Sequence, residues 1–218
     1  MFFLVLIICL FVFLFSLYVL GKDDYLFIRK NFSLEHLFDY ALVGLFFGII
    51  FARFLWGGFR SGIEKGFLPH LFSPNDAGIS LAAIVIGSML IIYCLSKYRK
   101  LPTWRLFDFF SLAFLPTFCF GYLASSLFVK KSEIFYYIAP AICYLGLSIL
   151  FWKVLYPRLI AGRLKNGSLS CLFLEIFSLT SFILLFAYQY LHLSVRLEAA
   201  YVISFIIIWA SLIFLLRN

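Results

Sequence analysis

The sequence predicts an all-α integral membrane protein with seven transmembrane helices, its N-terminus outside and its C-terminus in the cytoplasm. Of the 218 residues, 65% are hydrophobic and only 13% are charged, whereas soluble domains are roughly 45–50% apolar and about 25% charged. A backbone surrounded by lipid must satisfy its own hydrogen bonds, so only helices and closed barrels cross a membrane. The apolar runs here are continuous over about twenty residues, the length of a spanning helix, and lack the alternation of barrel strands.

Seven apolar runs follow one another and define a single polytopic membrane domain over residues 1–218. Short polar connections separate the runs. The longest connection, from Gly57 to Asp76, is rich in glycine and proline, which predicts a loop with a short interfacial piece. The predicted helices cover residues 2–20, 36–56, 77–96, 106–128, 133–156, 168–190 and 199–216.

The first run is interpreted as a retained helix and not as a cleaved signal peptide. No basic residue precedes it, and the residues around position 20 make a poor small-x-small cleavage site. Its basic flank, which consists of Lys22, Arg29 and Lys30, follows the run. Because basic residues favour the cytoplasmic side, this order predicts an external N-terminus.

Lysine and arginine are distributed unequally between alternate connections. The first, third and fifth connections together with the C-terminal tail carry 12 of these residues, and the other three connections carry 6. This bias predicts that the odd connections and the C-terminus are cytoplasmic. The net charge of +8 is then explained by cytoplasmic loops and anionic lipid, and no nucleic-acid partner is expected.

Ionisable residues near or inside the spans are the candidates for function. Arg53 lies near the outer end of the second run, as an interfacial anchor or a ligand for an anionic head group. Asp76 and Ser80 open the third run, where an aspartate also suits an ordinary helix start. Asp108 lies three residues after Arg105 at the start of the fourth run, which predicts an interfacial ion pair.

Glu175 is a less ordinary residue, because it lies about 10 Å into the sixth helix at 1.5 Å per residue. No lysine or arginine occurs at helical spacing from it. A protonated carboxyl group or a bond to a polar group on another helix would explain it. The three histidines lie apart, and the sequence has no metal-ligand cluster and no Gly-rich phosphate loop, so no cofactor is expected.

Four stretches of the chain resemble the prolipoprotein diacylglyceryl transferase family. Members of that family are seven-helix enzymes of the bacterial inner (plasma) membrane, with the same topology, that move a diacylglyceryl group from phosphatidylglycerol to a prelipoprotein cysteine. The resembling stretches occur in the same order as in the family, and together they extend over most of the chain. The stretches are residues 32–56 (FSLEHLFDYALVGLFFGIIFARFLW), 76–83 (DAGISLAA), 101–115 (LPTWRLFDFFSLAFL) and 165–177 (KNGSLSCLFLEIF).

The differences from the family pattern fall in its catalytic motifs. The family's histidine in the third helix corresponds to Ala82. Its G-R-x-G-N motif reads GYLAS here, so that Tyr122 replaces the arginine and Ser125 the asparagine. Tyr136 and Leu185 stand where the family has glutamates in its fifth and sixth helices.

The resemblance implies roles for the residues that remain. Tyr122 and Ser80 are the candidate catalytic residues, and Arg53, Lys130 and Lys131 are the candidates for binding the lipid phosphate. Asp76, Asp108 and Glu175 are expected to be structural polar residues. Transfer to a thiol needs cations that hold the phosphate and a base that activates the thiol.

Three functions therefore remain open. The first is a divergent transferase that acts on phosphatidylglycerol at the outer leaflet, with a prelipoprotein signal peptide as its second substrate. The second is a catalytically inactive relative that binds a lipid or a partner membrane protein. The third is a small transporter that uses Glu175 as a proton or substrate site.

Overall fold

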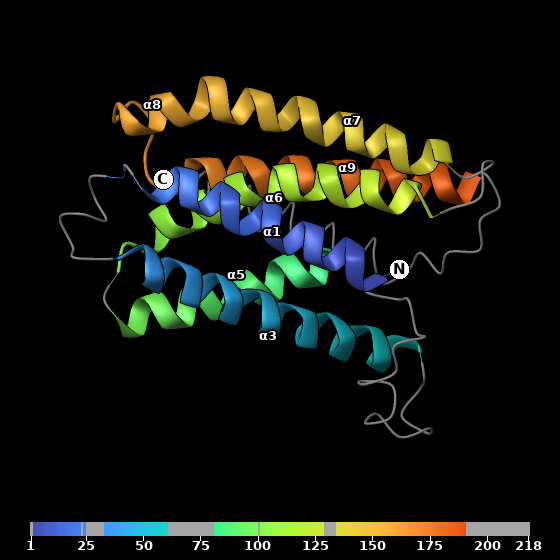
Figure 1. The fold of residues 1–218 in the computed structure, drawn as a ribbon, viewed down its shortest axis with the longest axis horizontal. Coiled ribbons are helices and arrows are strands. Elements are labelled where there is room, and N and C mark those ends of the chain that lie inside the picture. Colours follow the sequence, from blue (N-terminus) through green and yellow to red (C-terminus); the bar gives the residue numbers. More distant parts are fainter. Residues whose placement is uncertain are drawn as a thin grey trace.

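The computed structural model describes residues 2–22, 24, 33–60, 81–99, 101–128 and 134–190, and the regular elements of this part are all helices (Figure 1). Six of the seven predicted runs form helices, and the seventh, 199–216, lies outside the described residues. The helices are α1 (Phe2–Gly21), α3 (Leu34–Arg60), α5 (Leu81–Tyr98), α6 (Thr103–Ser126), α7 (Ile134–Leu150), α8 (Tyr156–Ile160) and α9 (Ser168–Tyr190).

Four of the helical segments are long and apolar enough to cross a membrane. They are Leu4–Gly21, Leu34–Ala52, Thr103–Ser126 and Ile134–Ile160. Ile84–Tyr98 and Ser168–Ser181 are shorter apolar helices. The chain is thus a helical multi-pass membrane protein, while the count of seven spans and the orientation in the membrane stay predictions.

The helices form a bundle of parallel and antiparallel neighbours with α6 at its centre (Figure 1). In α6, 67% of the residues are buried, against 28% in the spans of α1 and α3. The α6 helix packs against α1, α5, α7 and α9, whereas α3 packs chiefly on α5. The helices alternate in direction, so α1, α5 and α8 end at the same end of the bundle, where α3, α6 and α9 begin. We call it the α8 end.

Small residues allow α3 and α5 to approach closely. A Cβ atom on Gly48 of α3 would lie 2.7 Å from the carbonyl oxygen of Ile84 in α5, and one on Gly87 would lie 2.8 Å from Cβ of Phe51. Gly44, one turn before Gly48, faces Ile92. In lipid there is no hydrophobic driving force for apolar helices to associate. Close backbone packing of this kind therefore holds the pair together.

A proline in the central helix is compensated from α7. Pro116 has no N–H, so within α6 the carbonyl oxygen of Leu112 loses its usual partner four residues later. The indole Nε1–H of Trp152 donates to this oxygen over 3.2 Å. Trp152 lies in a π-helical turn, Phe151–Leu155, which joins α7 to α8. The fifth predicted helix thus continues past its expected end at residue 156 to Ile160.

Other helix ends shift by a few residues from their predicted positions. The predicted loop from residue 57 is wrong at its start, because α3 continues to Arg60. The α6 helix begins at Thr103, directly after Pro102, and not at residue 106. Proline has no N–H to donate to a preceding turn, so a helix does not extend before it, and its fixed φ suits the start of a helix. The α9 helix has the predicted bounds.

Candidate functional site

The residues expected at the end of the bundle opposite α8 are described only in part. Asp76, Ser80, Lys130 and Lys131 lie outside the described residues. Arg53 belongs to α3, and its side chain is not among those described. The predicted phosphate-binding group therefore stays a prediction.

Tyr122 lies in the last turns of α6 and faces α7. Its ring is stacked on the ring of Tyr144, with 5.9 Å between the centroids and 8° between the planes. A second tyrosine of α7, Tyr137, lies 6.5 Å away. The position at which the resembled enzymes have an arginine is thus part of a contact between aromatic rings.

This contact continues along the bundle as a column of aromatic rings between α6, α7 and α9. The rings of α6 recur every four residues, on the face that meets both neighbours. Phe118 packs on Tyr144 at 5.4 Å and on Phe177 at 5.3 Å. We call this set the aromatic column, and it comprises Phe114, Phe118, Tyr122, Tyr144, Phe173 and Phe177.

Tyr122 and the helix that carries Arg53 lie on different sides of the central helix α6. Tyr122 contacts the α7 side of α6, whereas the helix of Arg53 packs on α5 and α1. Figure 1 shows α3 and α7 on opposite sides of the central helices. The side of α6 near Tyr122 that meets α1 is close-packed, since a Cβ on Gly121 would lie 3.0 Å from Sγ of Cys9.

Asp108 has a different partner from the one expected. Its two carboxylate oxygens accept hydrogen bonds from the backbone amides of Gly167 (2.7 Å) and Ser170 (2.9 Å). These amides are at the start of α9, where the first turn has no partners of its own. A carboxylate also interacts favourably with the positive end of the helix dipole. Asp108 thus caps α9 from a neighbouring helix.

The predicted ion pair between Arg105 and Asp108 is not the one formed. Arg105 directs its guanidinium to Asp24, with Nη2 and Nε at 2.6 and 3.0 Å from the same carboxylate oxygen. Both side chains are at most 5% exposed. A third contact, of 3.5 Å, joins Nη1 to the side-chain oxygen of Asn166. The pair ties the end of α1 to the starts of α6 and α9.

Gly167 is required by this arrangement for two reasons. Its φ of +95° lies in the left-handed region, which strains residues with a Cβ. In addition, a Cβ there would lie 3.3 Å from the ring of Trp104. The sequence indicated none of the Asp24, Asn166 and Gly167 contacts, because they join residues about sixty or eighty positions apart. Among the described residues, these bonds therefore have a structural role: they hold the ends of α1, α6 and α9 together.

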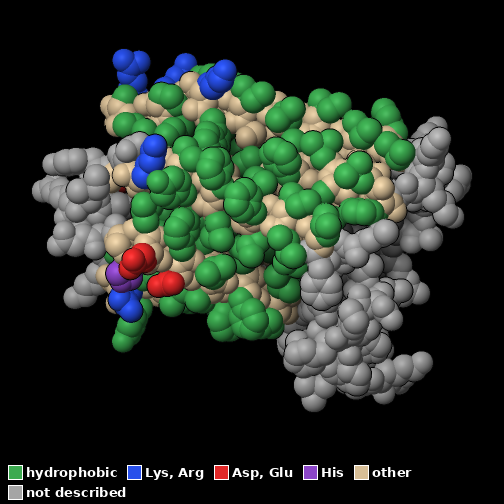
Figure 2. Space-filling view, in the orientation of Figure 1, with side chains coloured by type: hydrophobic (Ala, Val, Ile, Leu, Met, Phe, Trp, Pro, Cys, Tyr) green, Lys and Arg blue, Asp and Glu red, His purple; other side chains and the backbone are tan. Residues whose placement is uncertain are grey.

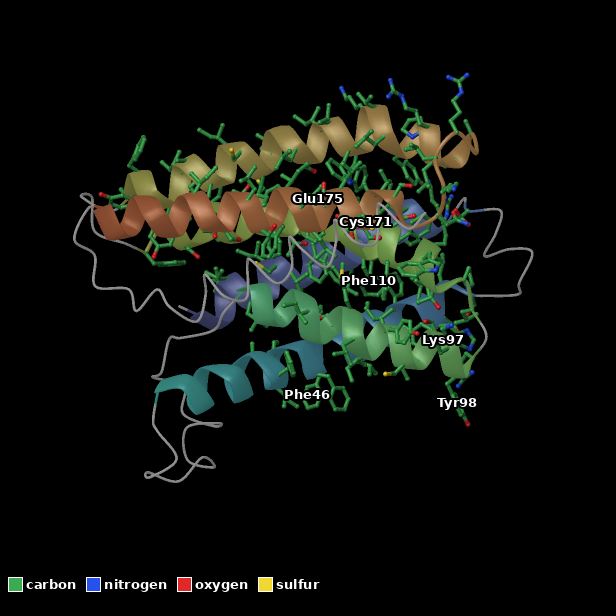
Figure 3. All side chains as sticks on the ribbon, turned by 180° about the vertical axis from the view of Figure 1, so that it is seen from behind. Phe46, Lys97, Tyr98, Phe110, Cys171 and Glu175 are labelled. Atoms are coloured by element: carbon green, nitrogen blue, oxygen red, sulfur yellow. The ribbon has the colours of Figure 1, made fainter. Side chains whose placement is uncertain are left out.

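Glu175 lies half-buried on α9, with Cys171 one turn before it (Figure 3). Its backbone carbonyl accepts a hydrogen bond from the Ser178 hydroxyl. Within the described part of the chain its carboxylate forms no ion pair. No group of three or more metal-ligating side chains occurs among the described residues.

Comparisons with protein-family models, with curated proteins and with solved structures give no match to this chain.

Proposed function

We propose that this chain is a multi-pass membrane protein that binds phosphatidylglycerol without transferring its diacylglyceryl group. In this proposal its N-terminus is outside, and the lipid lies in the outer leaflet at the end of the bundle opposite α8. Arg53, Lys130 and Lys131, which the sequence predicts on the outer side, would supply the positive charge for the phosphate. The resemblance to the diacylglyceryl transferases supports the choice of lipid.

The observation that carries the proposal is the position of Tyr122. A transferase must bring a phosphate-binding cation and a base to one reacting carbon. Tyr122 is instead held against Tyr144 on the α7 side of α6, while Arg53 belongs to a helix on the other side. A phenol that contributes to a column of rings stabilises packing. Tyr122 thus has a packing role in the described part of the chain, and this favours binding as the activity that we propose.

Native mass spectrometry of the purified full chain tests the binding. The protein is taken from mixed micelles that contain phosphatidylglycerol and phosphatidylcholine in equal amounts. We expect the wild type to retain phosphatidylglycerol selectively, and Arg53→Ala to retain fewer phosphatidylglycerol molecules per chain than the wild type. Arg99→Ala is the matched control, because Arg99 is exposed at the other end of the bundle. Equal retention by wild type and Arg53→Ala would contradict the proposal.

A second candidate function is proton-coupled transport, and it rests on Glu175. A carboxyl group within a membrane helix is costly unless it has a role, and this one is half-buried without an ion pair among the described residues. In proteoliposomes with an internal pH dye, transport would stop in Glu175→Gln and continue in Glu35→Gln, whose site is exposed at the start of α3. Unchanged proton movement in Glu175→Gln would exclude this candidate.

A further inference from the structure

The surface at the α8 end differs in charge between its two sides (Figure 2). Where α3 begins, acidic side chains lie beside basic ones, whereas only basic side chains gather over α8 and the adjoining end of α7. Residues 134–174 contain no aspartate or glutamate. Among the exposed basic residues of this segment are Lys153, Arg158 and Arg163, which we call the basic patch. Within the described part of the chain none of the three forms an ion pair.

The basic patch continues an apolar stripe on the outward face of α7. Ile142, Leu145, Ile149 and Leu150 are 46–63% exposed along this face. At 1.5 Å per residue, Lys153 lies about 4–5 Å beyond Leu150 along the helix axis, which is the scale of the headgroup layer outside a ~30 Å core. A phospholipid whose acyl chains follow the stripe would therefore bring its phosphate to the patch.

The backbone holds two of the basic residues next to each other. The α8 helix ends with Gly162 at a φ of +70°. The amide of Gly162 donates to the carbonyl of Leu159 over 3.2 Å, and that of Arg163 donates to the carbonyl of Arg158 over 3.0 Å. This is the Schellman arrangement, which reverses the chain after a helix. As a result, the backbones of Arg158 and Arg163 are in contact although the two residues are five positions apart.

A bond made by the preceding residue, Trp152, orients the helical turn that carries Lys153. Trp152, the preceding residue, is half-buried and bonds to the backbone of α6. This bond sets the rotation of the π-helical turn about its axis, so that Lys153 and Val154 face outward and are exposed. Lys153 is thus exposed, as are Arg158 and Arg163.

We propose that the basic patch binds the headgroup of an anionic phospholipid in the leaflet at the α8 end. The phosphate would accept bonds from the guanidinium groups of Arg158 and Arg163, whose planar forks suit phosphate oxygens. Lys153 would add a point charge nearer the membrane core, with its aliphatic stem along the acyl chains. This site lies at the other end of the bundle from the proposed phosphatidylglycerol site and is independent of it.

The test compares two variants that each remove two positive charges from the same end. Arg158→Gln/Arg163→Gln changes the patch, and Lys97→Gln/Arg99→Gln is the matched control, since both residues are exposed at the end of α5. Each full-length protein is equilibrated in micelles of phosphatidylcholine with phosphatidylserine as the anionic probe, and bound lipid is counted by native mass spectrometry. Because each basic residue near an anionic lipid contributes about 1 kcal/mol, the first variant should lose roughly 25-fold in preference for the anionic lipid.

Two outcomes would overturn the proposal. An unchanged preference in Arg158→Gln/Arg163→Gln would show that the patch does not hold the lipid, and equal losses in both variants would show a general effect of net charge. The wild type provides a measurement without any substitution: 1 M salt shortens the screening length from about 10 to about 3 Å and should weaken the preference. Repeating the count in Arg53→Ala separates the two sites, since that change should leave the patch lipid in place.

Discussion

The bond between Trp152 and the Leu112 carbonyl gives the sharpest prediction for stability. Trp152→Phe removes the indole N–H that donates over 3.2 Å but keeps an aromatic ring. The carbonyl of Leu112 is fully buried and lacks its helical partner because of Pro116. Hydrogen bonds between membrane helices contribute on average about 0.6 and at most about 1.7 kcal/mol, and a buried carbonyl without a partner costs about 1–3 kcal/mol. We expect the substitution to lower the free energy of unfolding by about 1.5 kcal/mol.

A double-mutant cycle separates this bond from the loss of ring volume. Pro116→Ala restores the N–H that Leu112 would accept in a regular helix. In that background, Trp152→Phe removes a donor that is no longer needed, so we expect its cost to fall by about 1 kcal/mol. The assay is unfolding in mixed micelles with increasing dodecyl sulfate, followed by circular dichroism. The reasoning is refuted if the substitution costs the same in both backgrounds, within the ~0.3–0.5 kcal/mol expected for independent sites.

Three further predictions use the same unfolding assay. Arg105→Ala should lower the free energy of unfolding by about 3–5 kcal/mol, because it removes the guanidinium that pairs with the buried carboxylate of Asp24. Adding Asp24→Ala should recover part of the loss, and no recovery would contradict the pairing. Asp108→Ala should cost roughly 2–3 kcal/mol by removing two bonds from the start of α9, and Asp108→Asn, which keeps one acceptor oxygen, should cost less. Gly48→Ala should lower the free energy of unfolding by about 1–3 kcal/mol, because the added methyl group overpacks α3 against α5. Gly146→Ala is the control: nothing lies within 4 Å of its Cβ, so it should be neutral or stabilising by up to about 1 kcal/mol. Equal effects of the two substitutions would contradict the glycine contact.

The positions of the helices could be predicted from the sequence because a helix surrounded by lipid needs a continuous run of apolar residues, which is visible in the hydropathy. The α9 helix has its predicted bounds. The continuation of α7 into α8 was less visible, since Pro157 ends an ordinary helical pattern, and a π-helical turn carries the chain up to it. Proline at the first turn of a helix costs no hydrogen bond, so α8 can begin beside it.

The partners of the polar side chains could not be predicted in the same way. Asp108 bonds to amides 59 and 62 positions away, and the sequence offers the much nearer Arg105 as an alternative. Arg105 in turn pairs with Asp24, 81 positions away. Pro116 gave one available signal, because a proline within a spanning helix leaves a carbonyl without its usual partner in the same helix. The identity of that group, Trp152, depends on how α7 packs on α6.

The separation of Tyr122 from the helix of Arg53 was also beyond the sequence. Both residues are expected near the same end of the bundle, and topology alone places them together. Only the packing of the helices decides the direction of Tyr122, which faces Tyr144 in α7. The aromatic column that includes it was not predicted, although the four-residue spacing of Phe114, Phe118 and Tyr122 in α6 is visible in the sequence.

The most direct test of binding without transfer measures both activities in one sample. The purified full chain is incubated with phosphatidylglycerol and a peptide that carries a prelipoprotein cysteine motif, and retained lipid and released glycerol phosphate are quantified together. We predict selectively retained phosphatidylglycerol and no release of glycerol phosphate. Glycerol phosphate formed in proportion to modified peptide would contradict the central claim, and so would a failure to retain phosphatidylglycerol in preference to phosphatidylcholine.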